Sequence, residues 1–297
     1  MKKVKQTYKM KESLTGFLFV FPAFLPILIF WVIPVLYSVG LSFTDWDMMS
    51  KDINFVGLNN YRSLINQTDF ARVLKNTLVF SLGSVIPTIV LGLMAALALN
   101  GAHKGTGVYR MAMFAPYITP MVAVSIVWSW IFEPRVGILN YILGVIGITG
   151  IEWTQSSDTS MLSVIIVTVW KQIGWAMIFY MEALRKVSKN LLEAASIDGA
   201  NALKRFFNIT VPMISPTTFF LFIIMTINSL QAYDQIQVLT QGGPAGSTRT
   251  LLYYYYIEAF ETFNTGKASA AALFLVAITI VLSLLETRAS KKFVYYE

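Results

Sequence analysis

Few residues of this chain have side chains that could do chemistry, and the most conspicuous is a cation in an apolar run. Lys171 lies about ten residues into residues 161–184, which at 1.5 Å per residue places it roughly 15 Å along a helix. A charge at that depth in a bilayer is costly and usually faces a cavity or a partner. Thr168, Gln172 and Trp175 are spaced so that all three share one helical face with Lys171.

A second polar face is expected in residues 211–230 and just beyond. It carries Asn228, Ser229 and Ala232 and ends near Asp234. An aromatic ring beside amides and hydroxyls suits a sugar, because the flat face of the sugar stacks while its hydroxyls form hydrogen bonds. Alternatively, Lys171 snorkels to the interface or pairs with Asp234 to hold two helices together. The charge of Lys171 could also favour an anionic solute, and the sequence does not decide between these.

Enzyme chemistry finds little support in the sequence. The chain has no cysteine. Its single histidine, His103, lies in a short basic loop, where it is expected to be a solvated side chain and not a metal ligand. Gly266-Lys267 resembles the end of a phosphate-binding loop but lacks the earlier glycine at the required spacing. We therefore predict no catalytic residues, no metal site and no cofactor bound by this chain, with any energy source in another chain.

The elements that must position these residues are membrane spans. The 297 residues are 56% hydrophobic and only 13% charged, which indicates an integral membrane protein. Apolar runs near the ~20 residues that cross a bilayer predict an all-α protein with six transmembrane helices in one domain, residues 1–297. The expected spans are residues 14–40, 74–99, 109–132, 161–184, 211–230 and 268–285.

Prolines and short apolar pieces add detail to this plan. Three prolines in the first run, and Pro87, Pro116 and Pro120 in the later ones, predict kinked helices whose freed carbonyls are satisfied by neighbours. The segment "GILNYILGVIGI" is too short to cross and is expected to form an interfacial or buried helix. Gly242, Gly243 and Pro244 predict a turn after the fifth span.

Basic residues give an expected orientation. They dominate both ends of the chain, the second loop and the fourth loop, whereas the other loops mix both signs of charge. By the positive-inside rule, both termini and the fourth loop are cytoplasmic. The formal net charge of +7 is thus a topology signal. Nucleic acid is not an expected partner, because no soluble surface interleaves basic and aromatic residues.

The fourth loop contains the stretch "EAASIDGANALKRFFNITVP". Asn190 with Glu193 three residues later is a helix-start signal, Glu193-Ala194-Ala195 favour a helix, and Gly199, after Asp198, should end it. A second helix then continues into the membrane at Val211-Pro212. Small alanines would let a partner approach closely. Glu193 could also be only a capping residue.

These residues carry a family resemblance. Glu193-Ala194-Ala195, Gly199, Ile209 and Pro212 resemble the EAA loop of the membrane subunits of ATP-binding-cassette importers, with Val211 where leucine is usual. "FVGLNNY", "VWKQIGW" and "TQGGPAGST" look like carbohydrate-uptake permeases related to the maltose and glycerol-3-phosphate systems. The resemblance covers nearly the whole chain, and six spans make it similar to the shorter members.

The resemblance implies the type I importer fold in a prokaryotic inner or plasma membrane. It implies a homologous second permease subunit, two cytoplasmic ATPases that hold ATP and Mg, and an extracytoplasmic solute-binding protein as partners. The coupling helix would be the one that contains Glu193, Ala194, Ala195, Asp198 and Gly199. It would transmit the closure of the ATPase dimer on ATP binding to the spans, which would rotate. Sugar contacts would come from Thr168, Lys171, Gln172, Trp175, Asn228, Ser229 and Ala232.

The function expected on this basis is ATP-driven uptake of a carbohydrate by a non-enzymatic permease subunit. Glycerol-3-phosphate, or another solute such as a polyamine or an anion, is the alternative. A self-sufficient secondary carrier is a third, but it should show pseudo-symmetric repeats and a membrane carboxylate for ion coupling. Neither is evident in the sequence.

Overall fold

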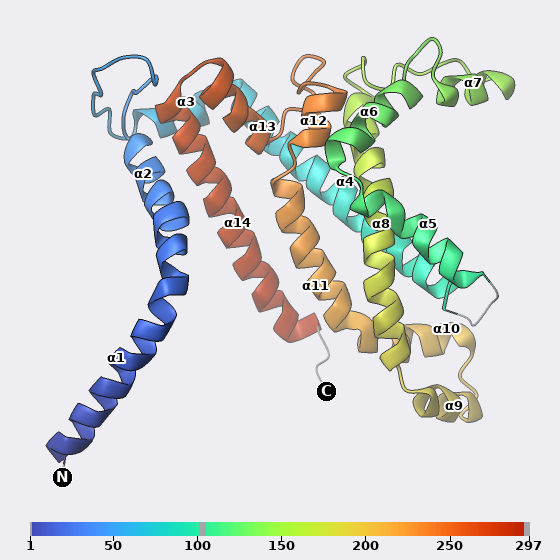
Figure 1. Cartoon of the computed structure of the whole chain (residues 1–297). Helices are drawn as coiled ribbons and strands as arrows, with labels where there is room; N and C mark the ends of the chain where they lie inside the picture. The colour runs from blue at the N-terminus through green and yellow to red at the C-terminus, as the bar shows by residue number, and fades with distance from the viewer. Residues whose placement is uncertain (1, 101–104, 294–297) are drawn as a thin grey trace.

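The computed structural model describes residues 2–100 and 105–293 and is built from helices (Figure 1). Within those ranges, extended pairing is limited to one isolated bridge between Thr44 and Phe55. His103, expected to be a bystander, lies outside the described residues. The all-α prediction is confirmed.

Five helical stretches are long and apolar enough to cross a membrane. They are Thr15–Leu41, Thr68–Ala98, Ser160–Lys186, Ala202–Leu230 and Thr265–Lys291. The first is formed by α1 (Lys2–Ile27), a π-helical turn at Leu28–Val32 and α2 (Ile33–Leu41); the second and third are α4 (Thr68–Ala98) and α8 (Ser160–Lys186). The fourth joins α10 (Ala202–Arg205) through a π-helical turn to α11 (Val211–Leu230), and the last lies in α14 (Thr265–Phe293). These helices coincide with five of the six expected spans.

The remaining expected span, residues 109–132, is not one continuous helix. It is split into α5 (Thr106–Ile118) and α6 (Met121–Ile131), whose axes are bent by 101°. Thr119 and Pro120 between them are extended, with ψ of 137° and 139°. The residue before a proline avoids the helical region and proline has no N–H to donate, which favours a break in the helix at this point. The count of six spans holds only if this bent pair is counted as one.

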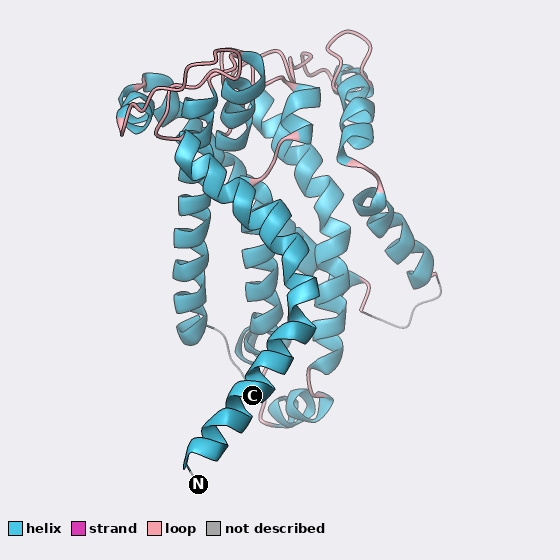
Figure 2. Cartoon of the chain, turned by 60° about the vertical axis from the view of Figure 1, so that its left-hand side comes forward, coloured by secondary structure: helices cyan, strands magenta, loops and turns pink. Residues whose placement is uncertain are grey.

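The first span diverges from the other helices along α1 and contacts α14 through α2 (Figures 1 and 2). None of its most apolar 18-residue window is buried against the rest of the chain. Large apolar side chains such as Phe19, Phe30 and Trp31 are more than two-thirds exposed. Its surface is thus available to lipid or to another protein.

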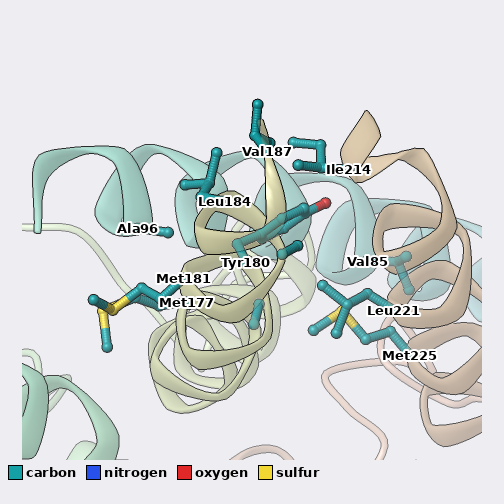
Figure 3. Packing of buried hydrophobic residues seen from close by; sticks show 12 residues of the cluster. Val85, Ala96, Met177, Tyr180, Met181, Leu184, Val187, Ile214, Leu221 and Met225 are labelled. Carbon is teal, nitrogen blue, oxygen red and sulfur yellow. The ribbon is translucent and has the colours of Figure 1, made fainter. Parts of the chain in front are cut away.

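The centre of the bundle is the contact between α4, α8 and α11. Tyr180, Met177 and Leu221 are completely buried there, with Val85, Ala96 and Met225 (Figure 3). The hydroxyl of Tyr180 donates to Thr218 Oγ1 at 3.1 Å, so this aromatic ring is buried with its polar atom satisfied. α8 is therefore packed against α4, α5 and α11.

Small residues bring the neighbours of α8 unusually close. A side chain at Gly92 of α4 would meet the Ala176 Cβ at 2.5 Å, and one at Gly174 would overlap the backbone carbonyl of Met113 in α5. Small residues allow this kind of backbone approach between helices in membranes. α5 is thus held against the same helix that carries Lys171.

The two ends of the bundle differ. α9 (Lys189–Ile197) and α10 lie at one end, together with the start of α1 and the end of α14 (Figure 1). The other end holds α3 (Asn59–Asn66), α7 (Ile138–Val145), α12 (Asp234–Leu239) and α13 (Leu251–Tyr256) (Figure 1). The expected short helix in "GILNYILGVIGI" is confirmed as α7.

The segment between α2 and α3 is ordered by its own polar groups. Asp45 accepts from the backbone N–H and the amide of Asn54, and these bonds hold the pKa of Asp45 below its ordinary value. Asn60 donates to the carbonyls of Ser42 and Thr44. The segment between α2 and α3 is therefore a structured loop.

Candidate functional site

A polar pocket lies where the broken span meets α8 and the end of α11. Its volume is about 240 Å³. α5 and α6 contribute Tyr117 and Met121, and α8 contributes Thr168, Lys171 and Gln172. The remaining walls are Asn228, Gln231, Ala232, Tyr233, Asp234 and Gln235. Two polar faces predicted from the sequence thus meet at one cavity.

Lys171 is engaged with the end of α5. Its ammonium donates to the carbonyl of Tyr117 at 2.7 Å and to that of Pro116 at 3.2 Å, and it lies 5.3 Å from the centre of the Tyr117 ring. In an unbroken helix the Pro116 carbonyl would accept from residue 120, but Pro120 has no N–H. A cation at a helix C-terminus also interacts favourably with the helix dipole. Lys171 therefore caps the helix at the break.

Pairing of Lys171 with Asp234 is not observed. The ion pairs among the described residues join Glu182 to Arg185 and Lys186, and Glu258 to Lys267. Asp234 is therefore not the partner of Lys171, which instead joins α8 to α5 through two backbone carbonyls.

The amides of the pocket are available to a ligand. Within the described ranges, the side-chain amides of Gln172, Asn228 and Gln231 make no hydrogen bond, and Asn228 and Gln231 are exposed. Thr168 is different: it is buried, donates to the Val164 carbonyl and lies 3.5 Å from the Gln235 amide. Free amides supply both donors and acceptors, so the pocket can bind a hydroxyl group either as a hydrogen-bond donor or as an acceptor.

Two of the residues predicted to share this site do not line it. Trp175 stacks on Tyr117 with ring centres 5.8 Å apart and contacts Phe179 at 4.8 Å, so it lies behind the pocket wall. Ser229 is buried against α4, with its hydroxyl 2.5 Å from that of Ser81. Adjacent helical residues point about 100° apart, so Ser229 cannot share the direction of Asn228. Thr168, Lys171, Gln172, Asn228 and Ala232 are placed at the pocket as expected.

The site also contains residues that the sequence analysis did not single out. Tyr117 enters from the bent pair, and Gln231, Tyr233 and Gln235 come from the turn between α11 and α12. The signal that could have found them is Pro120, because a break in an apolar run places irregular backbone at membrane depth only where it faces protein or a cavity.

The second candidate site is α9, which follows α8 after a two-residue turn. The helix begins at Lys189 with Ser188 at its N-cap, so the prediction of a start at Asn190 is wrong. Gly199 ends it with a φ of +82°, and the N–H of Ala200 bonds back to the Ala195 carbonyl at 2.9 Å. That geometry favours glycine, and the predicted stop is confirmed.

α9 presents an unpartnered surface at this end of the bundle. Glu193, Ala194, Asp198 and Gly199 are exposed, and Ala195 is half-buried. Ile197 is 87% exposed and Leu191 50%, whereas Leu192 packs against the core around Tyr180. The helix is therefore fixed on one face by the spans and left open on the other. Asn201 caps the next helix by accepting from the Lys204 N–H at 2.8 Å, as the predicted second helix requires.

The sequence matches a known family over most of its length. The family model described as "Binding-protein-dependent transport system inner membrane component" matches residues 88–294. The chain is 33% identical to the sn-glycerol-3-phosphate transport system permease protein UgpA of Agrobacterium fabrum, over 98% of this chain and 99% of that protein. It is also 33% identical to the probable ABC transporter permease protein YesP of Bacillus subtilis, over 97% and 94% of the two chains.

Solved structures share the fold. A chain of a bacterial ABC transporter involved in the import of the acidic polysaccharide alginate superposes with a TM-score of 0.83, covering 98% of this chain and all of that one at 22% identity. A chain of a bacterial alginate ABC transporter in complex with an alginate pentasaccharide-bound periplasmic protein superposes with a TM-score of 0.81 at 22% identity, covering 96% of each chain. At this identity the likeness concerns the arrangement of the helices.

Proposed function

Because the chain belongs to the family of binding-protein-dependent transport system inner membrane components, we propose that it is one permease subunit of an ATP-driven importer for a carbohydrate. The observation that carries the substrate class is the set of free amides around the pocket, with an aromatic ring from Tyr117 beside them. Amides and rings bind hydroxyls and sugar faces without needing a charge on the solute.

Lys171 supports a neutral polyol over an anion. Its ammonium is directed at two carbonyls and a ring, and Asp234 adds a negative charge to the same wall. The pocket therefore offers no uncommitted cation. Glycerol-3-phosphate is the second candidate, since UgpA is a relative at 33% identity. It would require the phosphate to draw Lys171 away from the end of α5.

A second permease subunit is proposed as the partner across the pocket. At about 240 Å³ the cavity is smaller than the ~300–1,000 Å³ of most small-molecule sites, which fits one wall of a shared site. The uncovered first span offers a large apolar surface for the same partner or for lipid.

We further assign α9 as the coupling helix. Its exposed Ile197 and Leu191 would enter a cleft of a cytoplasmic ATPase, with Glu193, Ala194 and Ala195 on the docking helix and Gly199 at its end. In this orientation, α9 and the start of α1 are cytoplasmic, as the basic residues of the fourth loop favour. ATP and Mg belong to the ATPase subunits, and the solute-binding protein docks at the opposite end.

The proposal is tested by assembling the importer in nanodiscs. The chain is co-expressed with the second permease and ATPase encoded with it, and ATP hydrolysis is measured with the purified binding protein and a panel of sugars, sugar acids and glycerol-3-phosphate. A neutral oligosaccharide that stimulates hydrolysis only with the binding protein is expected. Stimulation by glycerol-3-phosphate alone would replace the carbohydrate assignment, and failure of the chain to assemble with any ATPase would refute the importer assignment.

A further inference from the structure

A second polar pocket lies at the end of the molecule opposite α9. Its volume is about 340 Å³. The first turns of α4 contribute Asp69, Arg72 and Val73. The loop between α12 and α13 contributes Gln241, Gly242, Gly243, Ala245, Gly246 and Arg249. No residue of this pocket lines the pocket around Lys171.

The two arginines of the pocket have unused donors. Arg72 donates from Nη1 to the Ala245 carbonyl at 3.1 Å. Arg249 Nε is buried and has no hydrogen-bond partner among the described residues. The ion pairs of the described chain include neither arginine, nor Asp69. A buried charged donor left without an acceptor is costly, so a negative charge placed next to the guanidinium of Arg249 would be stabilising.

The loop that forms the pocket is held in one shape. Thr248 is completely buried, shares a hydrogen bond with Thr240 at 2.7 Å and donates to the Gly243 carbonyl at 3.0 Å. The Asn76 amide donates to the carbonyls of Gly246 and Arg249. Gly242 has a φ of +76°, and a Cβ there would meet the Tyr253 ring at 2.5 Å. Binding an anion therefore needs little ordering of the loop.

Both the composition and the place of the pocket indicate what fills it. Two guanidinium groups against one aspartate leave a net positive charge, and arginine binds carboxylates in a planar, paired geometry. Arg72 and Asp69 are exposed, so the pocket is open to solvent at the end of the molecule that holds α3, α12 and α13 (Figure 1). An acidic side chain on the surface of another protein could therefore enter this pocket. A solute could reach the Lys171 pocket without entering it, because the two pockets share no residue.

We propose that this arginine pocket is a docking site for an aspartate or glutamate side chain of the extracytoplasmic solute-binding protein. The inference rests on the proposed function, since it requires such a partner. Arg72, whose side chain is exposed, would meet the carboxylate first, and the guanidinium of Arg249, which also lines the pocket, would complete the pair. The contact would help to set the affinity and the salt dependence of docking.

The test compares Arg249→Gln and Arg72→Gln with a matched control, Arg62→Gln. Arg62 is an exposed arginine of α3 at the same end of the molecule and lines neither pocket. Affinity of the purified binding protein for the importer in nanodiscs is measured by surface plasmon resonance at several salt concentrations, beside the KM for binding protein in the ATPase assay. Each pocket variant should raise the Kd and the KM about tenfold or more, flatten the salt dependence and leave the maximal rate unchanged, while the control behaves like wild type.

Other outcomes would overturn the inference. Unchanged affinity in Arg249→Gln and in the double variant, with the wild-type importer still stimulated, would reject the docking site and leave the importer assignment standing. Absence of any stimulation of the wild type by the binding protein would instead reject the assignment on which the inference rests. Binding of free glucuronate to the importer alone, lost in Arg249→Gln, would reassign the pocket to an acidic solute.

Discussion

Replacing Lys171 with methionine tests whether this lysine caps the C-terminus of α5 or contacts the solute. The substitution keeps an unbranched side chain as long as the aliphatic part of lysine and removes the ammonium that donates to the carbonyls of Pro116 and Tyr117. Because these carbonyls end α5 beside a proline, no backbone N–H replaces the lost donor. The variant should loosen the bend between α5 and α6 even in the absence of solute.

The magnitude follows from the contacts. A hydrogen bond to a charged group contributes about 1.5–3 kcal/mol, and the contact with the Tyr117 ring adds about 0.5–1 kcal/mol. Water can reach the exposed bond to Tyr117, and removing a charge from the membrane relieves a desolvation cost. We therefore expect a net loss of about 1–2 kcal/mol. At about 2–4 °C per kcal/mol, the apparent Tm should fall by roughly 2–8 °C.

The assay is thermal unfolding of the purified importer without solute, followed by tryptophan fluorescence. Lys171→Arg should retain most of the stability, because it keeps a charged donor. Lys75→Met is the matched control, since Lys75 is an exposed lysine of α4 outside both pockets. If Lys171→Met unfolds with the wild-type Tm but needs at least tenfold more of an anionic solute for half-maximal transport, the capping argument is wrong and Lys171 is a solute contact.

Three further predictions concern the scaffold, the coupling helix and the topology. Gly174→Ala should prevent assembly, because the new methyl group overlaps the Met113 carbonyl, and the monodisperse peak in size-exclusion chromatography should be lost. The control Gly144→Ala, where a Cβ meets nothing within 4 Å, should elute normally. Equal elution profiles of the two variants would refute the close approach of α5 and α8. In Gly199→Val the new side chain has space, but holding valine at a φ of +82° costs about 1–2 kcal/mol and should distort the end of α9. Stimulated ATP hydrolysis should then be lost while the subunits still co-purify. Wild-type stimulation of ATP hydrolysis in this variant would exclude the coupling role. Cysteines at Asn201 and Gly246, added to a chain without cysteine, should react with an impermeant maleimide from opposite sides of the membrane, and labelling of both in intact cells would reverse or abolish the proposed orientation.

The parts of the fold that could be predicted from the sequence are those set by local composition. The fifth expected span, residues 211–230, coincides with α11 (Val211–Leu230), and the helix stop at Gly199 was readable because few other residues adopt its φ. The prolines predicted a kink in the third span, but not that the span would divide at Pro120 into two helices bent by 101°. Hydropathy along the chain measures how apolar a run is, and it carries no information about the direction of the helix on each side of a proline.

The candidate site was predictable in part. Helical periodicity placed Thr168, Lys171 and Gln172 on one face. Asn228 was expected on the second polar face, and the structure brings it to the same pocket. Periodicity could not show that the Tyr117 ring would stand between Trp175 and the pocket. It could not identify the acceptors of Lys171 either, since these are backbone carbonyls released by a break elsewhere in the chain.

ATP-driven accumulation of a radiolabelled carbohydrate in proteoliposomes tests the central claim most directly. The assembled importer, given binding protein outside and ATP inside, should concentrate the sugar above its external level. Gln172→Leu, which removes a free amide from the pocket, should reduce uptake at least tenfold while the complex remains assembled and hydrolyses ATP. Uptake that proceeds without ATP or without binding protein, or wild-type uptake by Gln172→Leu, would contradict the account.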